Sequence, residues 1–336
     1  MKLLNHIGVG AIPLHYQRFK MSINFKENYT SNPTKLLFHT ARLNDIKKGI
    51  FKPISMHFSL TDKCNLDCDF CSNKKRDGYE FTFEEVKNIL NVFKTLGAIS
   101  VEFTGGEPTL HKSINEIISH AKLIGYSIGL KSNGVDIKKH LTEDTIKNLT
   151  WLRVSLNSID YTSEDKLNFT NISKHTFLGF SYVYTDKTDD STFRKLKEFK
   201  DRFNGEYIRI IPDNSYDADK IRVLDKVVKL NSIFNEAGIF WHEKNYSIPE
   251  KCWMMWIKPF INTDKNIYYC CATQMFERKL IPKYKLCTTN TEDIIKTWMN
   301  PIVYSGKMCE GGICYYKNHN EMIQQIVDGN PHSDFI

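Results

Sequence analysis

The stretch SLTDKCNLDCDFCSNK, residues 59–74, places three cysteines in a short polar segment. Three residues separate Cys64 from Cys68, and two separate Cys68 from Cys71. Clustered cysteines in a protein of a reducing compartment indicate metal binding or catalysis rather than disulfides. A structural zinc ion needs four ligands, and the segment offers no obvious fourth, since His57 falls on the preceding predicted strand. Three thiolates do suit a four-iron cluster in which one iron keeps an open position.

The cysteine segment lies within an alternation of predicted strands and helices. A strand at residues 54–60 precedes it, and an amphipathic helix at residues 82–97 follows it. Further strands are predicted at 100–106, 126–134, 151–157, 181–186, 207–213 and 239–243, and further helices at 113–125, 142–149, 191–203 and 218–237. This alternation predicts an α/β fold with a parallel sheet, a full or partial barrel. Its chemistry is expected at the carboxyl ends of the strands, where the cysteine segment lies.

Two of these helices begin with the pattern of a capping box. Thr82 with Glu85 starts the first helix, and Ser113 with Glu116 starts the second. In a capping box each side chain satisfies one backbone N–H of the helix end. Both helices are therefore predicted to start at these residues.

The composition fits a globular protein without a membrane partner. The 336 residues suffice for one large domain or for a domain with a smaller companion. There is no apolar run of about 18 residues, the length of a membrane span, and the N-terminal stretch has no clean cleavage site. The expected location is the cytoplasm. The net charge of +7 comes from lysines spread along the chain, so a solvated basic surface is favoured over nucleic-acid binding.

Two motifs resemble those of the radical S-adenosylmethionine (SAM) superfamily. One is the cysteine spacing, with an aromatic residue, Phe70, directly before the third cysteine. The other is EFTGGEPTL at residues 102–110, where the superfamily carries a Gly-Gly-Glu-Pro motif. The resemblance covers residues 54–212 and implies a partial (β/α)6 TIM-like barrel. It also implies a SAM-binding [4Fe-4S] cluster on the three cysteines, cleavage of SAM to a 5′-deoxyadenosyl radical, and abstraction of a hydrogen atom from the substrate.

The same resemblance implies that the cluster loop and the Gly-Gly-Glu motif supply residues of the SAM site. Phe70 belongs to the cluster loop. Gly105 and Gly106 allow the backbone to approach the cofactor closely. Glu107 is expected to accept hydrogen bonds from the cationic amino group of SAM.

Further candidates stand at the ends of later strands. Ser132 and Ser155 are implied as contacts of the SAM carboxylate or ribose, and Asn133 and Asn157 are additional candidates. The alternative for each is an ordinary turn residue at a strand end. Arg209 is a charge inside an apolar strand. It either pairs with a carboxylate of cofactor or substrate at the barrel mouth or faces outward.

A second group of cysteines occupies the last third of the chain: Cys252, Cys270, Cys271, Cys287, Cys309 and Cys314. With a predicted hairpin at 259–271 and a Trp-containing helix at 291–300, this region resembles the cluster-binding extension called SPASM, or Twitch in its shorter form. The Twitch form implies a second, auxiliary [4Fe-4S] cluster on Cys252, Cys270, Cys309 and Cys314. Cys271 is the alternative to Cys270, because neighbours on a strand point to opposite faces. Cys287 is the alternative to Cys309, and a zinc knuckle is the alternative to a cluster.

These observations predict that the chain has three segments and that it is a radical enzyme. An N-terminal extension spans residues 1–52, the radical SAM core 53–248, and a SPASM/Twitch-like domain 249–336. The resemblance favours a peptide or protein substrate that is oxidised, crosslinked or epimerised. A small metabolite, sugar or nucleotide is the alternative substrate, and a non-enzymatic zinc protein is the alternative class. A flavodoxin- or ferredoxin-type protein is the implied electron donor.

Overall fold

The computed structural model describes residues 30–74, 76–185, 188–213, 238–242, 247–274, 282–309 and 314–329. In them, one sheet has the strand order β11-β10-β9-β1-β2-β3-β4-β5-β6-β7. Strands β1 to β7 are parallel to their neighbours. Their bounds are Ser55–Ser59, Ser100–Thr104, Ser127–Ser132, Trp151–Ser155, Phe177–Tyr184, Tyr207–Pro212 and Ile239–Trp241. The sheet is open rather than closed on itself, so the predicted α/β partial barrel is confirmed.

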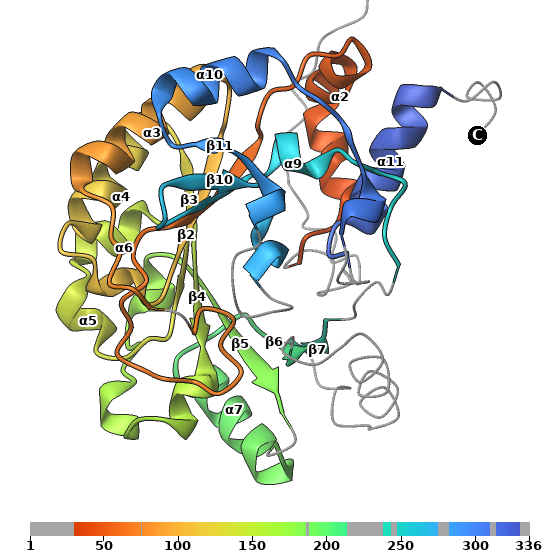
Figure 1. The fold of residues 1–336 in the computed structure, drawn as a ribbon. Coiled ribbons are helices and arrows are strands. Elements are labelled where there is room, and N and C mark those ends of the chain that lie inside the picture. Colours follow the sequence, from red (N-terminus) through yellow and green to blue (C-terminus); the bar gives the residue numbers. More distant parts are fainter. Residues whose placement is uncertain are drawn as a thin grey trace, which may run out of the picture.

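Helices cover the outer face of this curved sheet (Figure 1). They are α3 (Phe83–Thr95), α4 (Ile114–Leu123), α5 (Ile137–His140), α6 (Glu143–Asn148) and α7 (Asp190–Arg202). A 3-10 helix, η1 (Pro33–His39), runs into α2 (Thr40–Lys47). The predicted helix at 218–237 lies outside the described residues.

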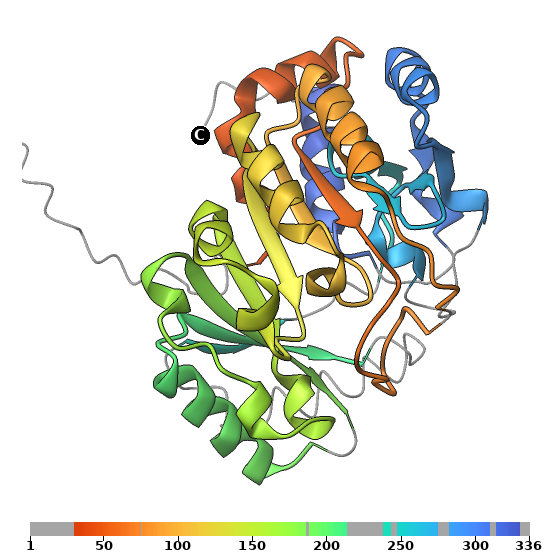
Figure 2. The ribbon, with the colours of Figure 1, turned by 90° about the vertical axis from the view of Figure 1, so that its left-hand side faces the viewer.

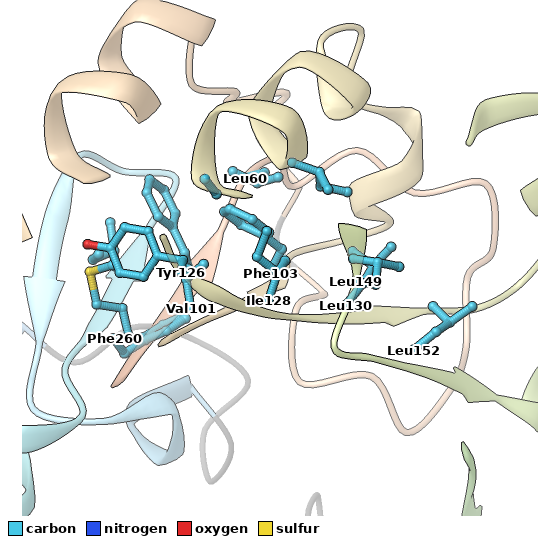
Figure 3. Packing of buried hydrophobic residues seen from close by; sticks show 14 of the residues in the cluster. Leu60, Val101, Phe103, Tyr126, Ile128, Leu130, Leu149, Leu152 and Phe260 are labelled. Atoms are coloured by element: carbon cyan, nitrogen blue, oxygen red, sulfur yellow. The ribbon is translucent and has the colours of Figure 1, made fainter. Parts of the chain in front are cut away.

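Alternation along the strands separates an apolar outer face from a polar inner face. Val101, Phe103, Ile128, Leu130 and Leu152 are fully buried, and Figure 3 shows them gathered from neighbouring strands with Leu60, Tyr126 and Leu149. Successive side chains of a strand point to opposite faces. The residues between these apolar ones, among them Glu102, Lys131 and Arg153, therefore face the barrel interior.

The C-terminal part extends the same sheet instead of forming a separate one. Strands β9 (Phe260–Asn262) and β10 (Asn266–Tyr268) form the predicted hairpin, and β11 (Lys285–Thr288) pairs with β10. Strand β9 runs parallel to β1, with His57 opposite Phe260. Figure 2 shows these C-terminal strands beside the N-terminal edge of the barrel. Residues after 249 thus contribute directly to the wall around the barrel interior.

The other C-terminal elements pack on this extension. They are β8 (Lys251–Cys252), α9 (Met254–Ile257), α10 (Thr291–Met299), β12 (Tyr304–Ser305) and α11 (Lys317–Asp328). Helix α10 lies beside α3, where the rings of Trp298 and Phe93 meet edge to face with centroids 5.0 Å apart. Strands β8 and β12 form a small second sheet. No helix of the described residues is both long enough and apolar enough to span a membrane.

The two predicted capping boxes have different outcomes. At α3 the reciprocal bonds between Thr82 and Glu85 are present, which confirms that box. At α4 the prediction is wrong, since Ser113 makes no side-chain capping bond. Its backbone N–H instead donates to Nδ1 of the buried His111 at 3.1 Å. The Ser113 N–H is therefore bound to His111 and is not available to the Glu116 carboxylate, which the capping box requires.

Replacing Thr82 by Ala is expected to lower the free energy of unfolding by about 1 kcal/mol, because the Glu85 N–H loses its acceptor and the Glu85 carboxylate loses the bond from the Thr82 hydroxyl. Ser113→Ala is the matched control at the start of α4 and should cost less than about 0.5 kcal/mol. Urea unfolding of both variants measures the difference. Equal losses of unfolding free energy in the two variants would contradict the conclusion that only α3 has a capping box.

Candidate active site at the cysteine loop and barrel interior

The three predicted cluster ligands lie on the loop that follows β1. Cys64, Cys68 and Cys71 are half-buried free thiols. The backbone N–H of Cys71 donates to the carbonyl of Cys68 at 3.1 Å, which turns the loop back on itself. Burial, with the charges of Cys71 and Cys64, raises the pKa of Cys68 to about 12. The three thiols are therefore close enough for the charge of each to act on another.

Two contacts hold this loop in shape. The Arg76 guanidinium donates to the carbonyl of Leu66 at 2.6 Å and reaches the Cys71 sulfur at 4.0 Å. On the other side the Phe70 ring packs against Tyr161, with centroids 6.5 Å apart. The Tyr161 hydroxyl accepts from the Asp69 N–H at 3.1 Å. Phe70 thus attaches the loop to the segment that follows β4.

The two glycines of the Gly-Gly-Glu motif are required by the cysteine loop itself. A Cβ on Gly105, whose φ is +147°, would lie 2.2 Å from the carbonyl oxygen of Thr61. A Cβ on Gly106 would lie 2.3 Å from that of Lys63. The N–H of Gly106 donates to Thr61 at 2.7 Å, and that of Glu107 donates to Lys63 at 2.7 Å. The close approach seen here is to the loop backbone, whereas the sequence predicted an approach to the cofactor.

Glu107 is a buried carboxylate that joins two strand ends. Its Oε1 accepts bonds from the N–H of Thr109 at 3.0 Å, from the Thr109 hydroxyl at 2.6 Å and from the Ser132 hydroxyl at 2.9 Å. Its Oε2 accepts from the N–H of Asn133 at 2.6 Å. Burial raises its pKa, and these bonds oppose the shift. Oε2 accepts only one of the described bonds, so this oxygen can still accept a hydrogen bond from another group.

Ser132 and Asn133 connect this carboxylate to the cysteine loop. The Ser132 hydroxyl also accepts from the N–H of Gly134 at 2.9 Å. The Asn133 amide donates to Asn65 at 2.7 Å and approaches the Cys64 sulfur at 3.7 Å. Asn133 therefore offers an N–H to a predicted cluster ligand, which is a different role from the SAM contact expected for it.

Asn157 and Ser155 lie after β4. The Asn157 side chain is buried, and it donates to the carbonyl of Val183 at 3.0 Å and accepts from its N–H at 2.7 Å. Both polar ends of Asn157 are thus occupied by the backbone of β5, which is a structural role. The half-buried Ser155 hydroxyl lies 3.5 Å from the Asn157 side-chain oxygen.

Charged side chains line the barrel interior below the loop. Glu102 on β2 forms ion pairs with Lys131 on β3, at 2.9 Å, and with Lys258, which precedes β9. The Lys131 amine lies 3.3 Å from Nε2 of His57. Burial opposes ionisation of Glu102, but the two lysines hold its pKa well below the usual range. Glu102 is therefore an anion.

Two arginines extend this charged wall. Arg153 on β4 donates to the Tyr207 hydroxyl at 2.8 Å, and its guanidinium lies over the Trp151 ring at 5.1 Å. Arg209 on β6 faces the interior, since Ile208 and Ile210 on either side of it are buried on the outer face. Its Nε is shielded from solvent and has no hydrogen-bond partner among the described residues. Burial and the Arg153 charge lower the pKa of Arg209 to about 10.

The C-terminal cysteines separate into two sets. The charges of Cys309 and Cys314 act on Cys252, whose pKa burial raises to about 12. Desolvation, with the charges of its neighbour Cys271 and of Cys252 and Cys309, raises the pKa of the half-buried Cys270 well above the usual value. The charges of the four residues predicted as auxiliary ligands thus act on one another.

Cys271 and Cys287 have other neighbours as well. Cys271 acts on Lys131 and Tyr316, which lie toward the barrel interior. Cys287 is buried beside Thr297 and Asp293, next to α10, and burial raises its pKa to about 11. Cys309, rather than Cys287, acts on Cys252, and Cys271 stays the alternative to Cys270.

In the parts of the chain that are described, no three His, Cys, Asp or Glu side chains converge on a single metal ion. Each thiolate of a four-iron cluster binds a different iron, so its ligands surround a volume and need not meet at one point. The loop thiols, with the Asn133 and Arg76 donors beside two of them, suit such a cluster in donor chemistry.

Sequence reasoning missed most of the interior charges. It singled out Arg209 but passed over Glu102, Lys131, Arg153 and Lys258. The available signal was the strand alternation itself, since Glu102, Lys131 and Arg153 interrupt apolar strands at positions that face inward. Lys258 had no such signal, because only the pairing of β9 with β1 brings it to Glu102.

Comparison with known sequences gives a family match over the core. Residues 58–204 match the Radical SAM superfamily. The GTP 3′,8-cyclase of Staphylococcus aureus (strain Mu3 / ATCC 700698) is 29% identical over 218 residues. The match covers 56% of this chain and 64% of the cyclase, so this chain spans less than two thirds of its relative's length.

Comparison with solved structures gives the same fold. SuiB of Streptococcus suis bound to its precursor peptide SuiA has a TM-score of 0.57 at 18% identity, covering 80% of this chain and 70% of SuiB. SuiB bound to S-adenosylmethionine has a TM-score of 0.54 at 20% identity, covering 73% of this chain and 67% of SuiB. At these identities the likeness establishes the fold.

Gly106→Ala is expected to displace the cysteine loop, because the new methyl group meets the Lys63 carbonyl. Iron analysis after anaerobic reconstitution should show a loss of about four irons per chain. Gly49→Ala is the control, since its Cβ meets nothing within 4 Å and costs only the left-handed backbone strain of about 1–2 kcal/mol. Full iron content in the Gly106 variant would contradict this role of the glycine.

Cys270→Ala is expected to lose the auxiliary iron, about four atoms per chain, whereas Cys271→Ala should retain it. The two substitutions remove the same thiol from adjacent positions, the second of which begins a 3-10 helix after β10. Iron content and the visible absorption of the reconstituted proteins measure the outcome. A loss confined to Cys271→Ala would reverse the assignment.

Proposed function

Because residues 58–204 belong to the radical SAM superfamily of enzymes, we propose that this chain holds a [4Fe-4S] cluster on Cys64, Cys68 and Cys71 and binds SAM beside Glu107. One observation carries the proposal. Three neighbouring half-buried thiols lie on a loop that backbone hydrogen bonds fix to the Gly-Gly-Glu segment. When bound, this pair of cofactors supplies a 5′-deoxyadenosyl radical that abstracts a hydrogen atom from the substrate.

The residues of the chain position and shield these groups. Asn133 and Arg76 direct N–H donors toward two of the thiolates, which stabilises negative charge on sulfur. Glu107 holds the ends of β2 and β3 together through Oε1, and its Oε2 is the proposed acceptor for the amino group of SAM. Ser155 remains a proposed SAM contact, and Phe70 is proposed to orient the loop beside the cofactor.

A second [4Fe-4S] cluster is proposed on Cys252, Cys270, Cys309 and Cys314. The mutual charge effects among these half-buried thiols support the assignment. Four thiolates leave no iron open, so this site suits electron transfer or structural support rather than SAM binding. A flavodoxin- or ferredoxin-type electron donor in the cytoplasm is part of the same proposal.

Two substrate classes remain as candidates. The resemblance to SPASM/Twitch proteins favours a peptide or protein that is oxidised, crosslinked or epimerised. The charged barrel interior favours the second class, a small polar metabolite, because Lys131, Arg153 and Arg209 offer side-chain partners for an anion. The interior lies directly below the proposed SAM site, so we favour the small molecule.

The reconstituted, reduced protein is expected to contain about eight irons and to convert SAM to 5′-deoxyadenosine and methionine. Replacing Cys64, Cys68 and Cys71 together by Ala should remove about four irons and abolish 5′-deoxyadenosine formation, measured by chromatography. Cys287→Ala is the control that removes a buried thiol outside both proposed sites. Cleavage of SAM by the triple variant would refute the proposal.

A further inference from the structure

The barrel interior holds more positive than negative charge among its described residues. Four cationic side chains, Lys131, Arg153, Arg209 and Lys258, come from β3, β4, β6 and the segment before β9. Their effects on each other and on His57 show that they share one region, in which Glu102 is the recurring carboxylate. Four cations against one carboxylate leave an excess of three positive charges.

Strand register places these groups on one wall. Lys131 lies opposite Arg153 in the pairing of β3 with β4. Arg209 is two residues further along β6 than Tyr207, whose hydroxyl accepts a hydrogen bond from Arg153. Glu102 and His57 are opposite each other on β2 and β1. The wall is therefore continuous from β1 to β6.

Aromatic rings underlie the arginines and hold Arg153 in place. A Cβ on Gly129 would lie 2.1 Å from the Trp151 ring, and one on Gly179 would lie 2.3 Å from the Tyr207 ring. The two rings thus cover glycines on β3 and β5, the strands on either side of β4. The Arg153 guanidinium lies over both, 5.1 Å and 5.6 Å from their centroids. This stacking fixes the direction of its donors, as in a preformed anion site.

Such an arrangement is costly without an anion. Like charges repel strongly where water is scarce, and a buried N–H without a partner carries a desolvation penalty. Lys131 and Lys258 share Glu102, which one carboxylate cannot neutralise fully. The Nε of Arg209 adds a shielded donor without a partner among the described residues. An added anion would relieve both costs.

We propose that this wall binds the phosphate groups of a small-molecule substrate, an inference that rests on the proposed function. An excess of three charges exceeds what the single carboxylate of SAM supplies, and a di- or triphosphate matches it. Arginine forks also suit the tetrahedral oxygens of phosphate. The position below the cysteine loop places the rest of such a substrate toward the proposed site of hydrogen abstraction.

Calorimetric titration tests the inference on the reconstituted protein, under anaerobic conditions and with saturating SAM. The probe is sodium tripolyphosphate, and citrate is the carboxylate comparison. Wild-type protein should bind tripolyphosphate more tightly than citrate. Arg209→Gln and Arg153→Gln should each weaken that binding about tenfold or more, the effect of one charge-assisted bond. Arg202→Gln is the matched control, because Arg202 lies exposed on α7 in an ion pair with Glu164.

Each outcome decides a separate point. No tripolyphosphate binding, tighter citrate binding, or an equal loss in Arg202→Gln would overturn the phosphate assignment. If Arg209→Gln does not fold, by circular dichroism and iron content, Arg153→Gln carries the same expectation. The wild-type preparation is also assayed for 5′-deoxyadenosine. SAM cleavage without tripolyphosphate binding overturns this inference alone, whereas absence of SAM cleavage overturns the proposed function.

Discussion

The short backbone pairing between the Gly-Gly-Glu segment and the cysteine loop is the constraint on which the rest of the site depends. Gly106 and Glu107 donate to Thr61 and Lys63, and a Cβ at either glycine would prevent that approach. The pairing places the loop over the end of β2. The Glu107 carboxylate then ties the same point to β3 through Ser132 and Asn133. One buried carboxylate and two glycines thus fix three proposed ligands relative to two strands.

A second constraint is the opposite character of the two sheet faces. The outer face is fully buried under helices through residues such as Phe103 and Leu130, and this burial supplies most of the driving force for folding. The inner face carries Glu102, Lys131 and Arg153 instead. Buried ion pairs add little net stability, because desolvation offsets their attraction. Charges on this face are therefore better explained by ligand binding than by folding.

The C-terminal region connects both features. Because β9 pairs with β1, the residues around it complete the wall of the barrel interior. Lys258 reaches Glu102, and the charge of Cys271 acts on Lys131, while the charge of Cys252 acts on Cys270. The proposed auxiliary ligands thus belong to the same part of the chain that completes this wall. A domain division at residue 249 marks a change in sequence pattern, but the sheet is continuous across it.

The sequence by itself determined the alternation of strands and helices, the spacing of Cys64, Cys68 and Cys71, and the Gly-Gly-Glu motif, because these depend on local periodicity and on neighbours along the chain. The Thr82 cap followed from the same local rules, whereas Ser113 failed because His111 competes for its N–H. Only the tertiary structure decided that Arg209 faces inward and that Asn157 is occupied by β5. These outcomes depend on contacts between segments far apart in the sequence, which only strand order and register specify.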